Sequence, residues 1–416
     1  MRKDFLRTFI TEFLVLVSGL AVYRLVAQVF GQDHFSEYAL IRRTLSLLLP
    51  ALLLGLSVGI PRYMSFSLKS ERPETANAFF AAALAVLLPT TLAFGILFVI
   101  FKKFFAYLLF GDPAYASFIL PMDLMLVGMI LNAVAYSYYR GRLQMGKANL
   151  LQLLNMAVLP LPALLVAEDF RGLLTMTGVA WITCSTLFFA TILKSLSWHR
   201  REIPPQAKKL LAYGLQRVPG DFGLAALLSL PAIFTTHLAG VRKGGAVAFG
   251  VSLLSMAGSA FAPIGLILLP KASQMLAERN APLLRYYVRR IMAATVFMTG
   301  AGMLVFELFA ERLITLYLGE SYYDLIVATR IIVIGSLAYT VYVSLRSLID
   351  AYYVKAINSL NIFISLFVFG LFALLAVVSL RSPVLIMIGF VLALWVLGFL
   401  TVRQTRKILK NDAVFS

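Results

Sequence analysis

Apolar residues run along this chain in long blocks, separated by short polar stretches. Each block is about as long as the ~20 residues that a helix needs to cross a bilayer. The pattern predicts an all-α polytopic membrane protein. We expect twelve membrane-spanning helices, at roughly 8–30, 38–61, 76–101, 117–139, 148–167, 172–194, 215–239, 245–270, 288–310, 323–348, 356–380 and 383–402.

Composition narrows the class further. The 416 residues are 61% hydrophobic and 13% charged, more apolar surface than a soluble domain of this length can bury in one core. The single cysteine, Cys184, lies inside a predicted span, and the three histidines are scattered along the chain. This usage predicts no disulfide framework, no metal site and no cofactor, and it argues against a metal-dependent enzyme.

The net charge of +18 is unevenly distributed between the two predicted sides of the membrane. Twenty-six Lys and Arg residues lie in the N-terminal segment, the even-numbered turns and the C-terminal segment, against seven on the opposite side. Cytoplasmic segments carry such an excess of basic residues. The sequence therefore predicts that both termini are cytoplasmic, and that the positive charge reflects topology rather than binding of nucleic acid.

An internal repeat is visible at the turns. A shift of 209 residues superposes Gly31 on Gly240 and Pro61 on Pro270, and a shift of 208 residues superposes further turn residues, including Gly111 on Gly319. Glycine and proline have backbone reasons to be kept at such hinges. A nearly constant offset across several hinges indicates a duplicated unit.

The repeat divides the chain into two lobes of six helices. We expect an N-terminal lobe at 1–195, a cytoplasmic linker at 196–214 that holds Pro204 and Pro205, and a C-terminal lobe at 215–416. Because six is even, the lobes have the same orientation and are related by a pseudo-two-fold axis along the membrane normal. Transporters with such parallel repeats bind substrate between the lobes and work by alternating access.

Four stretches carry a resemblance to a known family. The segments GQDHFSEYALIRRTLSLLLPALLLGLSVGIPRYMS (31–65) and YRGRLQMGKANLLQ (139–152) resemble the helix-two region and the turn after helix four of the polysaccharide transporter family. These are the Wzx-like flippases of the MATE and lipid-flippase superfamily. The outward turns GDPAY (111–115) and GESYY (319–323) are similar to that family's turns before helices four and ten.

The resemblance implies a MATE-like fold and a function. It implies a protein of the bacterial inner (plasma) membrane that moves an undecaprenyl-pyrophosphate-linked oligosaccharide, a polysaccharide or O-antigen repeat unit, to the outer leaflet. The implied partners are this lipid-linked glycan, the membrane lipids and the polysaccharide polymerase machinery.

Arginines within the apolar runs are the candidate substrate ligands. A lipid diphosphate is anionic, and the guanidinium fork matches phosphate oxygens without losing its proton. Arg24 and Gln28 share one helix face, and Arg42 is favoured over its neighbour Arg43 because its face is more polar. Arg330 is the candidate in the second lobe. The alternatives are an ion pair with a carboxylate for Arg24 or Arg330, and snorkelling to the interface for Arg42 and Arg43.

Acidic residues in the spans are candidates for ion coupling. The 209-residue shift superposes Glu12 on Asp221, and Asp123 lies in the fourth predicted span. A buried carboxylate can bind and release H⁺ or Na⁺. An ion pair is the alternative, for instance between Asp221 and Arg217 one turn earlier.

Three functional classes follow in order of preference. The flippase comes first because the spans hold four arginines and no excess of acids. A MATE-type cation-coupled multidrug exporter would need a cavity dominated by carboxylates. A membrane polysaccharide polymerase or glycosyltransferase is the least favoured, since it would need a large outer loop with catalytic residues.

Overall fold

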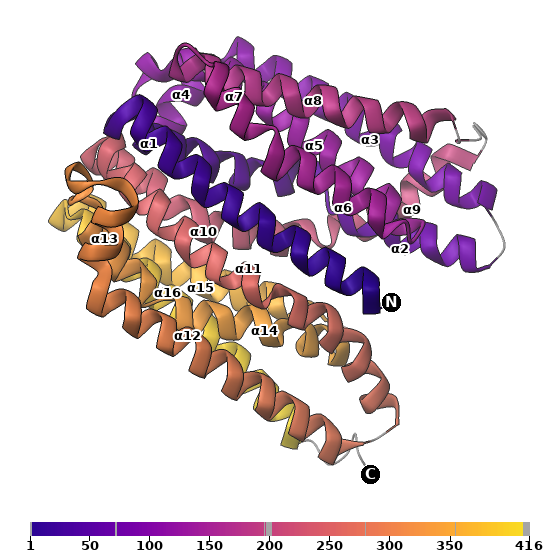
Figure 1. The fold of residues 1–416 in the computed structure, drawn as a ribbon. Helices are drawn as coiled ribbons and strands as arrows, with labels where there is room; N and C mark the ends of the chain where they lie inside the picture. The colour runs from indigo at the N-terminus through magenta and orange to yellow at the C-terminus, as the bar shows by residue number, and fades with distance from the viewer. Residues whose placement is uncertain are drawn as a thin grey trace. The chain divides into compact units, whose positions relative to one another are not determined.

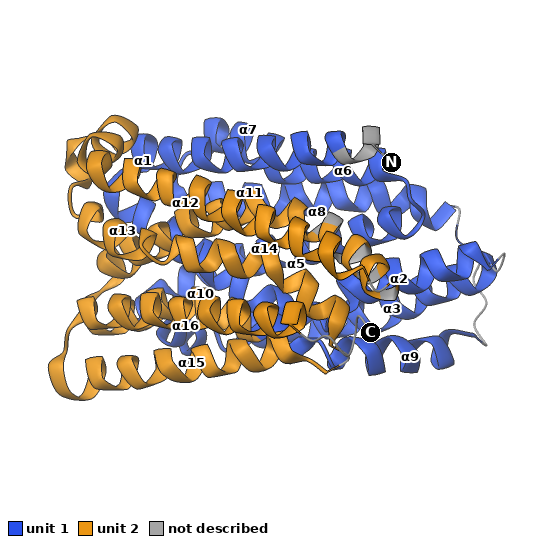
Figure 2. Cartoon of the chain, turned by 90° about the horizontal axis from the view of Figure 1, so that it is seen from below, with its two compact units in different colours: residues 1–222 blue, residues 223–416 orange. Residues whose placement is uncertain are grey.

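The computed structural model describes residues 2–70, 73–194, 196, 202–278, 280–353 and 355–410. Helices make up nearly all of this part of the chain, and it contains no β-strand (Figure 1). The chain divides into two compact units, Met1–Phe222 and Gly223–Ser416 (Figure 2). The predicted all-α class is confirmed.

The first unit begins with α1 and ends within α10. Its helices are α1 (Arg2–Leu53), α2 (Leu56–Lys69), α3 (Pro73–Ile100), α4 (Lys102–Phe110), the 3-10 helix η1 (Pro113–Phe118), α5 (Ile119–Gly141), α6 (Met145–Leu153), the π-helix η2 (Leu154–Val158), α7 (Pro160–Val166), α8 (Phe170–Lys194) and α9 (Ile203–Leu215).

The second unit takes most of α10 and continues to the end of the chain. Its helices are α10 (Val218–Ala239), α11 (Val241–Ala277), α12 (Ala281–Leu318), η4 (Glu320–Tyr322), α13 (Leu325–Val333), α14 (Ser336–Tyr352), α15 (Ile357–Leu375), the π-helix η5 (Ala376–Leu380) and α16 (Pro383–Lys410).

The long apolar helices fit the predicted spans. Within the described residues, ten helices are long and apolar enough to cross a membrane, or eleven spans if α13 and α14, which are bent by 44° at a break, form one. The first candidate, Leu6–Leu53, is 48 residues long. As a straight helix it would extend about 70 Å, more than twice the ~30 Å hydrocarbon core.

That first stretch reverses direction at Gly31. Its backbone there is not helical, with φ 81° and ψ −174°. The rings of Tyr23 and Phe35 have centroids 5.8 Å apart, although in a straight helix twelve residues would separate them by about 18 Å. The two arms of α1 therefore pack against each other as separate spans. With α1 counted as two spans and the bent pair α13 and α14 as one, the described residues hold twelve candidate spans, the number predicted.

The corresponding turn of the second unit has the same backbone conformation. Gly240, between α10 and α11, has φ 85° and ψ 166°. Residues other than glycine adopt this region only with strain. The aligned pair Gly111 and Gly319 also has positive φ, although the ψ angles are −4° and 169°. The first of these pairs agrees in conformation with the repeat that the sequence predicts.

Close helix contacts through glycine occur at the core of each unit. In the first unit α5 packs along α8, and a Cβ atom on Gly128 would lie 2.7 Å from the Cβ atom of Trp181. In the second unit α14 packs along α16, and a Cβ atom on Gly398 would lie 3.0 Å from the Cβ atom of Ala338. Small residues let helix backbones approach closely where lipid offers no hydrophobic drive for association.

The segment predicted as a linker contains a helix. Residues 203–215 form the helix α9, which packs against α2 and α3 of the first unit, and Leu210 on α9 is fully buried. Pro204 and Pro205 lie at the start of this helix, where a missing N–H costs no hydrogen bond. The division into two compact units falls between 222 and 223, within α10. Part of the predicted linker, 195 and 197–201, lies outside the described residues.

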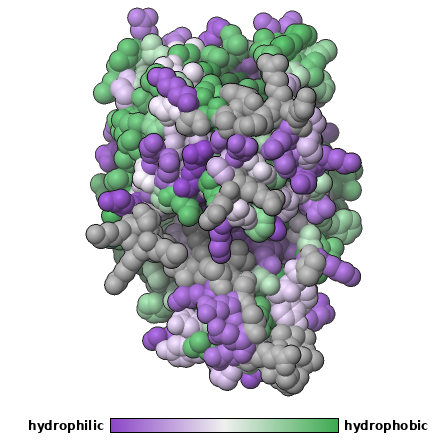
Figure 3. Space-filling model, turned by 90° about the vertical axis from the view of Figure 1, so that its right-hand side faces the viewer, coloured by the Kyte–Doolittle hydropathy of each residue, from purple (hydrophilic) through white to green (hydrophobic). Residues whose placement is uncertain are grey.

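The surface matches a multi-pass membrane protein. Many large apolar side chains are exposed along α12, for example Phe297 at 76% and Leu308 at 68%. Figure 3 faces the right-hand ends of the helices in Figure 1, and hydrophilic side chains cover much of that end, with hydrophobic ones toward its margin. Contiguous apolar surface of this kind is stable in lipid and not in water.

Candidate functional site

The α1 hairpin of the first unit carries the largest group of candidate residues. Tyr23 on the first arm packs edge-on against Phe35 and Tyr38 on the second, with ring centroids 5.8 and 5.2 Å apart. All three rings are buried. Such edge-to-face pairs stabilise a contact beyond the area they bury. They fix the arms relative to each other and set the direction of the polar residues beside them.

Arg42 lies one turn after Tyr38 and hydrogen-bonds its hydroxyl group. The guanidinium is half-buried, and among the residues that the structure describes its ionisable neighbours are Tyr38 and Tyr23, not a carboxylate. Arg43 is also half-buried. The structure thus places Arg42 beside an aromatic pair that leaves its positive charge uncompensated.

Arg24 and Gln28 lie one turn apart on the first arm of α1. Both side chains are exposed, whereas Tyr23 and Ala27, which precede them, are buried in the unit. Neither side chain forms a hydrogen bond or ion pair with another residue in the described part of the chain. They point away from the packed interior of their own unit, into lipid or into a hydrated space. A guanidinium on a lipid-facing side would be costly, which favours the hydrated space.

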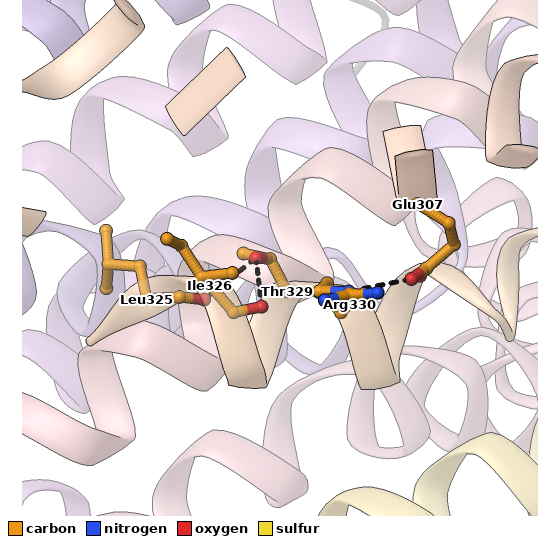
Figure 4. Close-up of polar contacts among 5 residues, drawn as sticks. All are labelled: Glu307, Leu325, Ile326, Thr329 and Arg330. Atoms are coloured by element: carbon orange, nitrogen blue, oxygen red, sulfur yellow. Dashed lines mark hydrogen bonds and ion pairs between the residues drawn. The ribbon is translucent and has the colours of Figure 1, made fainter. Parts of the chain in front are cut away.

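Arg330, the candidate in the second unit, has a carboxylate partner. Its Nε atom lies 2.9 Å from the Oε2 atom of Glu307 on α12, and the two side chains are 52% and 25% exposed. Figure 4 shows the pair bridging α13 and α12, while the neighbouring Thr329 hydroxyl donates back to its own helix. The ion pair that the sequence left as an alternative is present, with Glu307 as the acid.

Two candidate carboxylates also have basic neighbours. Asp221 has an Oδ2 atom 4.0 Å from the Nε atom of Arg217, the pair that the sequence suggested as the alternative to coupling. Glu12 on α1 is within electrostatic range of Arg140 at the end of α5. Arg140 in turn lies over the ring of Tyr136, 5.6 Å from its centroid.

Asp123 differs from the other two acids. It lies on α5 and its carboxylate faces α3, where a Cβ atom on Gly95 would be only 2.9 Å from the Asp123 Oδ2 atom. Among the described residues, its carboxylate has no hydrogen-bond or ion-pair partner. A half-buried carboxylate without a cation is chemically able to take up a proton or a small cation.

A buried polar network joins α5, η2 and α8 in the first unit. The Asn155 Nδ2 atom donates to the Asn132 Oδ1 atom at 2.9 Å and lies 3.1 Å from the Ser185 hydroxyl, and Asn132 donates to Gln152 at 3.2 Å. Asn155 and Ser185 are fully buried. The sequence analysis missed this network. Its signal was the polar spacing of Asn149, Gln152 and Asn155 inside an apolar run.

The π-helix η2 passes through this network. It spans Leu154–Val158, and the carbonyl of Ala157 accepts a 2.6 Å hydrogen bond from Ser18 on α1. Single π-turns inside α-helices are frequent at functional sites. The described residues contain no cluster of His, Cys, Asp and Glu able to hold a metal ion.

Comparison with known proteins finds likeness in structure and not in sequence. No protein-family model matches the chain, and no curated protein matches it. Among solved structures, an inward-facing multidrug resistance MATE family transporter of the MOP superfamily has a TM-score of 0.73 at 15% identity, over 98% of this chain and 98% of that chain.

Two further solved structures agree with the first. The eukaryotic MATE transporter AtDTX14 has a TM-score of 0.71 at 13% identity, over 99% of this chain and 96% of that chain. A MOP superfamily transporter from Pyrococcus furiosus has a TM-score of 0.66 at 17% identity, over 100% and 96%, and its binding pocket is described as having reverse polarity. The chain is a multi-pass membrane protein with the fold of MATE transporters.

Proposed function

We propose that this protein is a flippase that translocates an undecaprenyl-pyrophosphate-linked oligosaccharide from the inner to the outer leaflet of the bacterial inner membrane by alternating access. In this proposal both termini face the cytoplasm, as the distribution of basic residues predicts. The fold of MATE transporters supports the transport class. The charges of the first unit support the cargo.

The observation that carries the proposal is the unpartnered charge of Arg24. Its guanidinium points away from the interior of its unit and has no carboxylate partner among the described residues. Within the described residues, no carboxylate neutralises Arg42 on the other arm of the hairpin either. By contrast Asp221 and Glu307, two acids of the spans, each lie beside an arginine. Both candidate arginines of this hairpin therefore keep an uncompensated positive charge within the described part of the chain, which suits an anionic cargo.

The proposed mechanism uses arginine as a substitute for water around the diphosphate. The planar fork of Arg24 donates two parallel hydrogen bonds to phosphate oxygens, and Gln28 one turn away donates a third. Binding of the diphosphate offsets the cost of keeping the guanidinium inside the membrane. The polyprenyl chain stays in lipid. The glycan and diphosphate cross the membrane when the binding site changes from inward-facing to outward-facing.

Ion coupling is part of the proposal and is assigned to Asp123. Of the three candidate acids, it is the one without a basic neighbour in the described part of the chain. Uptake of H⁺ or Na⁺ at this carboxylate would change the charge between α5 and α3. Glu12 and Asp221 are assigned to electrostatic pairing with Arg140 and Arg217.

A cation-coupled multidrug exporter is the second candidate. Two of its supports are the MATE fold, shared with a transporter described as a multidrug resistance protein, and the unpaired carboxylate of Asp123. A cationic drug would be attracted to that carboxylate and repelled by Arg24. The neighbour with a pocket of reverse polarity indicates that this fold accommodates pockets of more than one charge.

Reconstitution into liposomes separates the two candidates. The purified protein is tested with a fluorescent undecaprenyl-diphosphate glycan and, in parallel, with the lipophilic cation ethidium, each with no gradient, a proton gradient or a sodium gradient. We expect transfer of the lipid-linked glycan between leaflets and no accumulation of ethidium. The Asp123→Asn variant is expected to keep transfer but lose its dependence on the gradient.

The controls concern insertion and charge. Arg312→Ala removes an exposed arginine near the C-terminal end of another long apolar helix, α12, and leaves the α1 hairpin unchanged. It should transfer the glycan as the unmodified protein does. Transport of ethidium without any transfer of the glycan would overturn the flippase proposal and support the exporter.

A further inference from the structure

A cationic cavity opens at the C-terminal end of α16 in the second unit. Its volume is about 850 Å³. Four lining side chains are basic, Arg403, Arg406, Lys407 and Lys410. The remaining walls are largely aromatic and apolar, formed by the end of α14 and by Phe399 and Val402 of α16. None of the described residues that line the cavity is a carboxylate.

The four basic residues lie on one face of the helix. Their spacing of three, four and seven residues from Arg403 returns to the same side at 100° per residue. All four side chains are exposed, and none forms an ion pair with another residue in the described part of the chain. Four like charges around one cavity repel one another, so the site is stabilised by an anion that enters it.

The cavity lies at the depth of the lipid headgroups. The run 383–402 of α16 contains no charged residue and is about 30 Å long at 1.5 Å per residue, the thickness of the hydrocarbon core. The basic face begins directly after it, at Arg403. Phe399 and Val402 therefore lie at the boundary with the acyl chains, and the basic side chains lie just beyond it.

Contacts with neighbouring helices hold the end of α16 in place. The hydroxyl of Tyr353, after α14, donates to the Gln404 Oε1 atom at 3.3 Å. The Nε atom of Arg285 on α12 donates to the Leu409 carbonyl at 2.9 Å. Burial, with Tyr352 adding to it, raises the pKa of Tyr353, so this hydroxyl stays a neutral donor. The cavity walls are thus fixed by hydrogen bonds and are not merely a frayed helix end.

We propose that this cavity binds the phosphate headgroup of an anionic phospholipid from the leaflet at this end of the helices. The cationic wall suits one or two phosphates, and the apolar floor at Phe399 suits the beginning of the acyl chains. Tyrosines at this depth are typical of the membrane interface. A soluble phosphate would use the cationic wall alone and leave the apolar floor in contact with water.

The competing explanation is that these residues serve topology alone. Basic residues collect at cytoplasmic helix ends whether or not they bind a lipid. A matched pair of variants separates the two explanations. The cavity variant carries Arg403→Gln, Arg406→Gln, Lys407→Gln and Lys410→Gln. The control variant carries Lys194→Gln, Lys208→Gln, Lys209→Gln and Arg289→Gln, which removes the same charge from exposed residues outside the cavity.

Lipid binding is measured on the purified full-length protein in detergent. Cardiolipin, phosphatidylglycerol, phosphatidylcholine and inorganic pyrophosphate are titrated separately, with the thermal midpoint and the number of bound lipids in native mass spectrometry as readouts. We expect cardiolipin and phosphatidylglycerol to bind and raise the midpoint, and phosphatidylcholine not to. The cavity variant should bind the anionic lipids at least about tenfold more weakly, and the control variant within about twofold of the unmodified protein.

Three results would overturn the proposal. They are equal weakening in the two variants, equal binding of phosphatidylcholine, and stabilisation by pyrophosphate as strong as that by the lipids. If the fourfold cavity variant does not fold, Lys407→Gln with Lys410→Gln is measured in its place, and unchanged lipid binding in that variant counts equally against the site. No cargo is present in this experiment, so its outcome is independent of the proposed flippase function.

Discussion

The two units resemble each other in the backbone conformation of a turn and differ in whether an intramembrane arginine has an acidic partner. Gly31 and Gly240 form the same turn, with φ of 81° and 85°. Yet Arg330 of the second unit forms an ion pair with Glu307, at 2.9 Å, whereas Arg24 of the first unit has no acidic partner in the described part of the chain. A charged residue in an apolar run is therefore not by itself a sign of function. What decides is whether the neighbouring helices supply its counter-charge.

Substitution of Arg42 sharpens the contrast most strongly. Arg42→Gln keeps a hydrogen-bond donor beside Tyr38 but removes a charge that no described carboxylate balances. We expect the rate of glycan transfer in liposomes to fall about 10- to 100-fold, the value of a charged hydrogen bond. Arg43→Gln is the matched neighbour and should retain more than half of the rate. Equal losses in both variants would show that the transfer rate depends on the total charge of this helix segment and not on the position of Arg42.

Alanine at the two hinge glycines tests the similarity of the units. Gly31→Ala and Gly240→Ala each force a side chain into a backbone region that only glycine adopts without strain, although a Cβ atom meets nothing within 4 Å at either position. The expected cost is about 1–3 kcal/mol of unfolding free energy in each case. Denaturant titrations of the two variants should agree within error. A loss confined to one variant would mean that the two turns are not equivalent.

The ion pair of the second unit gives the smallest expected effect. Arg330→Ala should lower stability by about 0.2–1 kcal/mol, because the pair is partly exposed. Arg330→Ala combined with Glu307→Ala should recover part of that loss, and a double-mutant cycle measures the coupling. Glycan transfer should stay near normal in the double variant. Abolished transfer at normal stability would place Arg330 in the site after all.

Sequence alone predicted the class of fold because a bilayer imposes a length on every apolar run. The reversal at Gly31 was also predictable, since the apolar pattern breaks there and glycine recurs at the same place in the second half. The helix α9 was not predicted from the sequence. Pro204 and Pro205 between basic clusters indicated a linker, but proline is also common in the first turn of a helix.

The candidate site was harder to predict because partners come from other helices. Helix periodicity predicts which face of its own helix Arg330 occupies. It does not predict which face of α12 is turned toward that helix, so Glu307 could not be identified as the partner from the sequence. The pair of Asp221 with Arg217 was within reach because both lie one turn apart on the same chain segment. The network around Asn155 depends on contacts between α5, η2 and α8, and only its stripe of polar residues was visible beforehand.

The most direct test of the account is glycan transfer by Arg24→Ala and Arg24→Lys in the same liposomes, with protein amount and thermal midpoint matched to the unmodified protein. The account predicts that transfer is lost in Arg24→Ala and only partly kept in Arg24→Lys, because lysine retains the charge without the two-pronged geometry. Full transfer by Arg24→Ala at normal protein levels would contradict it.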